Sequence, residues 1–230
     1  MNQNTCIIFD FGGTLDTNGV HWSIMFFNEF ERLGIESNFE KFSKSFMKSD
    51  KYLMEICPGI KDYKSLLREQ IFFMINDLTK FNSCDNAMLT NDVLNEIWND
   101  VSSCLINSVN LLRNLKIKYD IGLVSNFYGN LQAVCRDLCI SDYFNVIVDS
   151  GNAGIEKPHP GIFSIALKKL SALPENTLVV GDSYERDIVP SKILGCETVW
   201  LNNKSWKKQS SSYYADYIIS DLNELYKIII

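Results

Sequence analysis

Four short apolar runs, each followed by a polar residue, constrain the fold of this chain more than any other feature of its sequence. Continuous apolar runs of this length are typical of strands that are buried on both faces of a parallel sheet. The runs are Cys6–Phe9 before Asp10, Ile121–Val124 before Ser125, Val146–Val148 before Asp149, and Leu178–Val180 before Gly181 and Asp182. The carboxyl ends of parallel strands meet at one edge of a sheet, where ligands bind. We therefore expect these polar residues to lie near one site.

Helical periodicity fills the chain between these runs. Apolar residues recur at helical spacing within 109–115, 131–138, 162–170 and 188–194. Two more apolar runs lie near the C-terminus, at 197–201 and, as a candidate sixth strand, at 215–219. Strands that alternate with helices predict an α/β fold with a parallel, Rossmann-like sheet core.

The segment 17–88 breaks this alternation, because it holds long helical patterns and no comparable strand. Phe26 and Phe30, for example, share one face of a predicted helix. We predict that 17–88 is an all-helical domain inserted into a core formed by 1–16 and 89–230. Its many aromatic residues are expected to pack in the interior of the insert rather than to form a ligand cage.

Charge, apolar-stretch length and cysteine content limit the expected partners and cellular location of the protein. The net charge of -6 argues against nucleic acid as a partner, since phosphate backbones are bound by clustered Lys and Arg. No apolar stretch approaches the length that spans a bilayer, so no membrane partner is expected. The seven cysteines form no CxxC pair. Cys6, Cys104, Cys135 and Cys139 lie among apolar residues and are expected to be buried, reduced thiols, which favours a cytoplasmic location.

Four motifs stand in order at or after the predicted strands. They are Asp10-Phe11-Gly12-Gly13-Thr14, Ser125-Asn126, Lys157-Pro158, and Gly181-Asp182-Ser183 with Asp187. Each motif alone also suits an ordinary turn, helix end or surface lysine. Together and in this order they resemble the motifs of the haloacid dehalogenase superfamily, in particular its phosphatase-type members with a helical cap. The resemblance covers nearly the whole chain outside the helical insert.

The resemblance implies covalent catalysis with magnesium. Asp10 would attack the phosphorus of a phosphorylated small molecule and form an aspartyl phosphate. Asp10 and Asp182, with the backbone carbonyl of Gly12, would bind Mg²⁺, which prefers oxygen ligands. Lys157 would pair with Asp10 and the transferring oxygens, and Asp187 would orient Lys157 or a metal-bound water.

The same resemblance implies a phosphate-binding set. Ser125, the Asn126 amide and turn amides near Gly13 and Thr14 would hold the phosphoryl oxygens as their charge redistributes. The helical cap would close over the site and select the substrate. The substrate and the oligomeric state are not readable from the sequence, because cap shape leaves no decodable motif.

Gly12 is a departure from this pattern. The phosphatases of the superfamily carry a second aspartate at that position, which protonates the leaving group and later deprotonates water, and general acid–base catalysis is worth about 10² to 10⁴ in rate. Asp16 and His21 are candidate substitutes, although each also suits a polar turn residue or a surface histidine. Alternatively, the leaving group departs unprotonated, as from an acyl phosphate, a phosphoanhydride or an activated aryl ester.

Two other functions remain open at this stage. Phosphonate-cleaving members carry alanine at the position of Gly12 and use a cap lysine to form an imine, but Lys41, Lys44, Lys48 and Lys51 are spaced like a solvated helix face. Alternatively, the protein is a catalytically weak, phosphoryl-ligand-binding pseudoenzyme. Dehalogenation is disfavoured, because the superfamily's dehalogenases lack the Gly-Asp-Ser form of the fourth motif. We predict magnesium-dependent hydrolysis of a phosphorylated small molecule.

Overall fold

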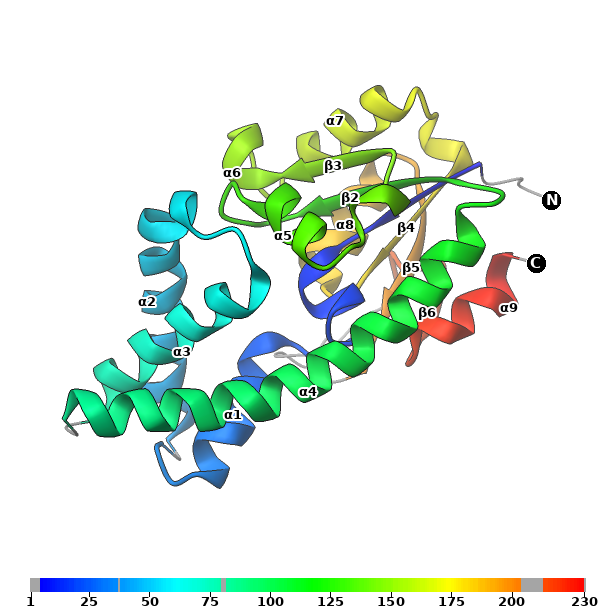
Figure 1. Cartoon of the computed structure of the whole chain (residues 1–230). Coiled ribbons are helices and arrows are strands. Elements are labelled where there is room, and N and C mark those ends of the chain that lie inside the picture. Colours follow the sequence, from blue (N-terminus) through cyan, green and yellow to red (C-terminus); the bar gives the residue numbers. More distant parts are fainter. Residues whose placement is uncertain (1–4, 37, 80–81, 204–212, 230) are drawn as a thin grey trace.

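A six-stranded parallel sheet forms the centre of the protein in a computed structural model that describes residues 5–36, 38–79, 82–203 and 213–229 (Figure 1). The strand order is β3-β2-β1-β4-β5-β6, and all neighbouring strands are parallel. The strands are β1 (Cys6–Phe9), β2 (Asp120–Ser125), β3 (Val146–Asp149), β4 (Thr177–Gly181), β5 (Glu197–Leu201) and β6 (Tyr217–Ile219). This architecture confirms the predicted α/β, Rossmann-like fold.

The strands form where the apolar runs lie because the sheet buries them on both faces. All residues of β1 and β4 are buried. Strand β6 is shorter than the predicted 215–219 and begins at Tyr217. Asp216 lies just before it, and its carboxylate accepts hydrogen bonds from the Thr198 amide at 2.9 Å and from Lys192 at 2.6 Å.

Some helices flank the sheet, whereas α1 (Trp22–Arg32), α2 (Phe39–Ile56) and α3 (Tyr63–Leu78) form a separate group on one side of it (Figure 1). The other helices are α4 (Ser83–Leu115), α5 (Leu131–Asp137), α6 (Ser150–Ala153), α7 (Gly161–Leu170), α8 (Val189–Ile193) and α9 (Tyr226–Ile229). Short polar side chains cap the first turns of three helices: Asn38, Asp62 and Asn82 accept hydrogen bonds from amides of α2, α3 and α4.

Helix α4 links the inserted helices to the sheet. It packs against α1 and α3 near its start, and further along the Ser108 hydroxyl donates a 2.6 Å hydrogen bond to the Leu15 carbonyl, just after β1. The predicted domain boundary at residue 88 lies inside this unbroken helix. The division into a core of 1–16 and 89–230 and an insert of 17–88 therefore stays a prediction.

Aromatic side chains form the interior of the insert. Phe26, Phe30 and Phe42 are fully buried. Phe30 and Phe42 pack edge to face at 5.5 Å between ring centroids, and Phe26 packs in the same way on Phe46 at 5.9 Å. These contacts agree with the expectation that the aromatic residues pack in the interior of the insert.

The cysteine prediction is correct for two residues and wrong for one. Cys6 and Cys135 are buried free thiols, and Cys104 is partly buried. Cys139 is exposed. Cys139 follows Cys135 by four positions, but α5 ends at Asp137, so helical spacing no longer sets the direction of its side chain.

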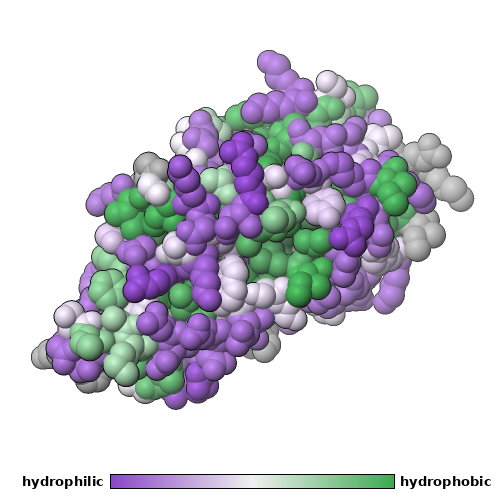
Figure 2. Space-filling view, in the orientation of Figure 1, coloured by the Kyte–Doolittle hydropathy of each residue, from purple (hydrophilic) through white to green (hydrophobic). Residues whose placement is uncertain are grey.

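Hydrophilic side chains cover most of the face shown in Figure 2, with apolar side chains visible between them. Among the residues that the structure describes, no helix is both long and apolar enough to cross a membrane.

Candidate active site

The candidate site lies at the carboxyl end of β1, where the strand order changes direction. Strands β2 and β3 lie on one side of β1, and β4 to β6 lie on the other. A cavity of about 440 Å³ opens at this point. Asp10, Ser125 and Asp182, which end or follow β1, β2 and β4, line it together, as the sequence predicted for this edge of the sheet.

The two glycines after Asp10 have different structural requirements. Gly13 has φ +97°, and a Cβ there would lie 2.6 Å from the Asp182 carboxyl group, so only glycine fits. Gly12 has ordinary backbone angles, φ -75° and ψ 115°. A Cβ at Gly12 would lie 3.8 Å from the indole ring of Trp22, which is an ordinary van der Waals contact. The backbone therefore does not require glycine at position 12.

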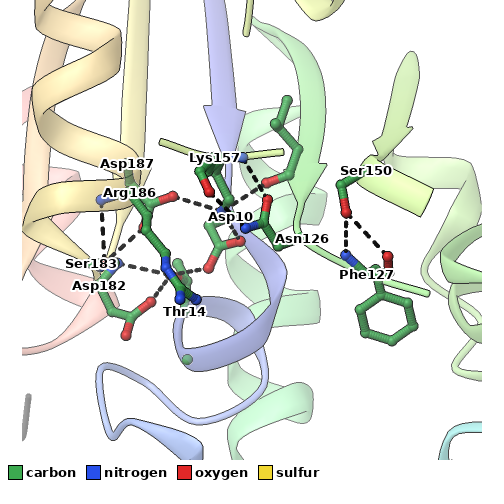
Figure 3. A network of polar contacts seen from close by, with 12 residues as sticks. Asp10, Thr14, Asn126, Phe127, Ser150, Lys157, Asp182, Ser183, Arg186 and Asp187 are labelled. Atoms are coloured by element: carbon green, nitrogen blue, oxygen red, sulfur yellow. Dashed lines mark hydrogen bonds and ion pairs between the residues drawn. The ribbon is translucent and has the colours of Figure 1, made fainter. Parts of the chain in front are cut away.

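Lys157 connects two of the carboxylates (Figure 3). Its Nζ donates to Asp10 Oδ1 at 2.5 Å and to Asp187 Oδ1 at 2.7 Å, and all three side chains are buried. The Asn126 side chain holds the backbone of this lysine, since its Nδ2 donates to the Lys157 carbonyl at 2.9 Å and its Oδ1 accepts from the Lys157 amide at 2.8 Å. Asn126 therefore positions Lys157.

Thr14 connects the first motif to the fourth. Its hydroxyl lies 3.3 Å from both Asp10 Oδ2 and Asp182 Oδ1, and it accepts a 3.1 Å hydrogen bond from the Asp182 amide. The Trp200 indole donates to the Asp182 carbonyl at 2.9 Å. These contacts fix the Asp182 carboxylate beside Asp10.

The floor of the cavity carries an excess of negative charge. Burial raises the pKa of Asp182 well above its usual range, and the charges of Asp10 and Asp187 raise it further. Burial also raises the pKa of Asp187, to about 6, although Lys157 opposes this shift. Burial alone would lower the pKa of Lys157, but the carboxylates of Asp10 and Asp187 outweigh it and hold that pKa above its usual range. One ammonium therefore faces three carboxylates.

This donor set suits a divalent cation. Carboxylate oxygens of Asp10, Asp182 and Asp187 lie within 4.8 Å of one another. Oxygen ligands and concentrated negative charge are what Mg²⁺ prefers. Asp187 is already engaged, since it accepts from Lys157 and, at 3.0 Å, from the Ser183 amide. Both oxygens of Asp187 are thus used. Asp10 also accepts from Lys157, but within the described residues its Oδ2, like Asp182 Oδ1, contacts only the Thr14 hydroxyl at 3.3 Å, which leaves Asp10 and Asp182 freer to act as ligands. Gly12 also lines the cavity.

The predicted phosphate-binding residues are only partly gathered around the cavity. Ser125 and Asn126 line it, whereas Gly13 and Thr14 are buried behind it. The Gly13 amide donates a 2.7 Å hydrogen bond to Asp16 Oδ1. A role for Gly13 and Thr14 in phosphate binding stays a prediction, and Gly13 would have to give up this hydrogen bond.

Asp16, a candidate substitute acid, lies behind the cavity wall and is fully buried. Its carboxylate accepts hydrogen bonds from the Trp22 indole at 2.9 Å and the Tyr63 hydroxyl at 2.5 Å, in addition to the Gly13 amide. Burial raises its pKa to about 7, although these hydrogen bonds oppose the shift. In this arrangement Asp16 positions two side chains that do line the cavity, Trp22 and Tyr63.

His21, the other candidate, lines the cavity directly. Its Nδ1 accepts a hydrogen bond from the Ser23 amide at 3.2 Å and thereby caps α1. Burial lowers its pKa to about 4, and the charge of Arg186 contributes. This lowered pKa favours the neutral ring at pH 7, and a neutral ring that accepts at Nδ1 carries its proton on Nε2, from which it is a poor acid.

Several cavity residues were not identified as site residues from the sequence. Trp22, Asp50 and Tyr63 come from α1, α2 and α3 and line the cavity together with residues of the four motifs. Trp22 shares the helical spacing of Phe26 and Phe30, and this spacing gives no sign that the edge of its ring would lie beside Gly12. Arg186 also lines the cavity, and its position within the fourth motif was a usable signal.

Asp149 follows a predicted strand but does not line the cavity. Its carboxylate accepts hydrogen bonds from three backbone amides, those of Gly129 at 3.0 Å, Leu131 at 2.9 Å and Gly151 at 2.9 Å. It thus fixes the loop that follows Ser125 and Asn126. Its role is to hold the backbone next to the site.

A family model and several known proteins match this chain. The family model for haloacid dehalogenase-like hydrolases matches residues 5–192. Glyceraldehyde 3-phosphate phosphatase of Pyrococcus furiosus is 34% identical over 123 residues, which cover 52% of this chain and 51% of that protein. Pyrimidine 5'-nucleotidase YjjG of Escherichia coli is 30% identical over 133 residues, which cover 56% of this chain and 58% of that protein. The chain thus matches about half the length of these curated relatives.

A solved structure shares the fold over nearly the whole chain. The putative HAD-hydrolase YfnB of Bacillus subtilis, solved with magnesium bound, superposes with a TM-score of 0.58 at 19% identity, covering 97% of each chain. At this identity the likeness concerns the fold alone.

Proposed function

The chain belongs to the haloacid dehalogenase-like hydrolases, and on that premise we propose that it hydrolyses a phosphorylated small molecule through an aspartyl phosphate at Asp10. The observation that carries this proposal is the buried network in which Lys157 bridges Asp10 and Asp187 while Asp182 lies beside them on the cavity floor. Two curated relatives bear the names of enzymes that remove phosphate from small molecules, which supports the same reaction class.

Asp10 and Asp182, with the Gly12 carbonyl, would hold a divalent cation, and Mg²⁺ is the proposed ion. When bound, the cation supplies positive charge that offsets the repulsion between the phosphate dianion and the carboxylates. The fit rests on the oxygen donor set and on the pKa of Asp182, which burial and then the charges of Asp10 and Asp187 raise well above its usual range.

Asp10 then acts as the nucleophile. A bond forms between one Asp10 oxygen and phosphorus as the bond from phosphorus to the leaving group breaks. Lys157 holds Asp10 in place and places positive charge next to the transferring oxygens, with Ser125 and the Asn126 amide as further donors. Water then attacks the aspartyl phosphate, which releases phosphate and restores the Asp10 carboxylate.

The proposed reaction lacks an obvious general acid. Gly12 has no side chain, Asp16 is enclosed behind Trp22 and Tyr63, and the low pKa of His21 leaves it neutral. We therefore favour substrates whose leaving group departs as a stable anion. Asp16 and His21 remain the alternatives if alkyl phosphates prove to be good substrates.

Steady-state hydrolysis tests this function. Para-nitrophenyl phosphate, acetyl phosphate and a panel of sugar and nucleotide phosphates would be assayed with Mg²⁺ and with a chelator. We expect magnesium-dependent turnover of the good leaving groups, and its loss in Asp10→Asn. Asp92→Asn, which removes an exposed carboxylate from α4, is the matched control and should keep wild-type rates. Absence of turnover on every substrate would refute the proposal and favour a phosphoryl-ligand-binding pseudoenzyme.

Phosphonate cleavage receives less support. The candidate lysines for imine formation have exposed side chains. Lys41, Lys44 and Lys48 form ion pairs with Glu36, Glu40 and Asp77, respectively. None of these three, nor Lys51, is among the described residues that line the cavity. Borohydride trapping with an aldehyde phosphonate is the direct test, and a trapped adduct would reverse this preference. The predicted cytoplasmic location belongs to the same proposal.

A further inference from the structure

Among the described residues that line the cavity, Arg186 is a cation without an ion-pair partner. It lines the same cavity as Asp10 and Gly12, and its side chain is exposed. Within the described residues, its guanidinium takes part in no hydrogen bond or ion pair of the structure. Lys157, by contrast, is fully occupied by Asp10 and Asp187.

Arg186 lies in the short helical turn Tyr184–Ile188 of the fourth motif and lines the cavity. In the view of Figure 3 its side chain passes in front of Thr14. Its charge also acts on the opposite wall, since it lowers the pKa of His21 and opposes the rise in the pKa of Asp50. His21 precedes α1 and Asp50 lies in α2, and both residues line the same cavity as Arg186.

Neither Gly12 nor its neighbour Trp22 supplies a proton to a departing oxygen. The edge of the Trp22 indole lies beside Gly12, and its only N–H donates to Asp16. A departing oxygen that receives no proton keeps its negative charge. A nearby cation stabilises such an anion without transferring a proton.

We propose that Arg186 receives the leaving group and that the substrate is a phosphoanhydride or an acyl phosphate. This inference rests on the proposed function and specifies its substrate class. A guanidinium presents a planar fork of N–H donors that matches the two oxygens of a carboxylate or phosphate. Phosphate and carboxylate are the groups that these two substrate classes release.

The chemical step balances without an acid. The Asp10 oxygen forms a bond to phosphorus, and the bond between phosphorus and the bridging oxygen breaks. The electron pair stays on the bridging oxygen, which leaves as part of a phosphate or carboxylate anion paired with Arg186. The water that later cleaves the aspartyl phosphate gives its protons to the released phosphate and to solvent.

The test compares substrates that all have good leaving groups, so that differences in their rates do not arise from a need for a general acid. Acetyl phosphate and pyrophosphate release anions with paired oxygens, whereas para-nitrophenyl phosphate releases a phenolate with one oxygen on an apolar ring. We expect Arg186→Gln to lower the ratio of kcat/KM for acetyl phosphate or pyrophosphate over that for para-nitrophenyl phosphate by about 10- to 100-fold, the range for one charge-assisted hydrogen bond.

Two further variants show whether the guanidinium group itself causes the change in this ratio. Arg186→Lys keeps the charge without the fork and should restore only part of the ratio. Arg113→Gln removes an exposed arginine from the last turn of α4 and should leave both rates at wild-type values.

The outcomes separate this inference from the proposed function. An equal loss on all three substrates, or no loss on any, would overturn the role of Arg186, while Asp10-dependent hydrolysis of para-nitrophenyl phosphate would still support the proposed function. Wild-type preference for alkyl phosphates over all three substrates would also overturn the inference. A wild-type protein inert on every substrate would overturn both.

Discussion

At the residue scale, the two adjacent glycines of the first motif differ in whether the structure requires glycine at their positions. Gly13 is fixed by its left-handed backbone and by the Asp182 carboxylate, which would clash with any Cβ. Gly12 is constrained by neither, since its backbone is ordinary and a Cβ would touch only Trp22. Neither the backbone nor the packing therefore explains why an acidic residue is missing at position 12, and this position is open to substitution.

Gly12→Asp should raise kcat/KM for alkyl phosphates such as glycerol phosphate. The new carboxyl group would enter the cavity beside Asp10, after a small rotation of Trp22, and general acid catalysis is worth about 10² to 10⁴ in rate. Para-nitrophenyl phosphate should gain much less, because its leaving group needs no proton. Gly12→Asn has nearly the same shape without an acid and is the control. An equal gain in both variants would show that packing, rather than proton donation, caused it.

Asp16 should make the stability of the protein depend on pH. Burial raises its pKa to about 7 in the folded state, compared with about 3.9 in an unfolded chain. The folded state therefore binds more protons between about pH 4 and 7, so the free energy of unfolding should fall as pH rises through that range and level off above it. Other buried acids titrate nearby, so the quantity to measure is wild type minus Asp16→Asn, from urea unfolding at each pH. A difference that does not vary with pH would contradict the assignment.

At the element scale, the loop after β2 depends on a carboxylate from β3. Asp149 ends β3 and binds the amides of Gly129, Leu131 and Gly151. Gly151 packs so closely that a Cβ there would lie 2.5 Å from the Gly129 nitrogen. The position of Ser125 and Asn126 in the cavity thus relies on contacts that lie outside it.

Asp149→Asn should destabilise the protein and weaken substrate binding together. The amide of asparagine would face a backbone N–H in place of an acceptor oxygen, and leaving a buried donor unsatisfied costs about 1 to 3 kcal/mol. Urea unfolding measures the loss of stability, and KM for para-nitrophenyl phosphate reports the displacement of the loop. Asp142→Asn, at an exposed position before β3, should change neither. Normal stability and KM in Asp149→Asn would show that the loop holds its shape without this carboxylate.

The elements were more predictable from the sequence than the site they build. Apolar runs mark the strands because both faces of the sheet are buried, and they place Asp10 and Asp182 at one edge. The same rule placed Asp149 there, but its side chain satisfies backbone amides, which a linear pattern does not reveal. The contact between Trp22 and Gly12 depends on how the inserted helices pack against the sheet, and no local spacing encodes that.

At the scale of the whole molecule, the candidate metal site joins segments that are far apart in the chain. Asp10 follows β1 and Asp182 follows β4, and the parallel pairing of these strands brings them together only in the folded protein. A cation that binds both residues should therefore bind the folded state and not the unfolded chain. Its binding free energy then adds to the stability of the entire fold.

Mg²⁺ should accordingly raise the thermal stability of the wild-type protein, by about 1.4 kcal/mol for each tenfold increase in concentration above its dissociation constant. Asp182→Asn should differ from the wild-type protein both without and with Mg²⁺. Without Mg²⁺ it should be more stable than wild type, because it removes a buried carboxylate that Asp10 and Asp187 repel, and it should gain little from added Mg²⁺. Thermal unfolding with MgCl₂, with chelator and with NaCl at matched ionic strength measures both effects, and Asp92→Asn is the control. A variant that responds to Mg²⁺ as strongly as wild type would exclude Asp182 as a ligand, because the ion would then be bound elsewhere.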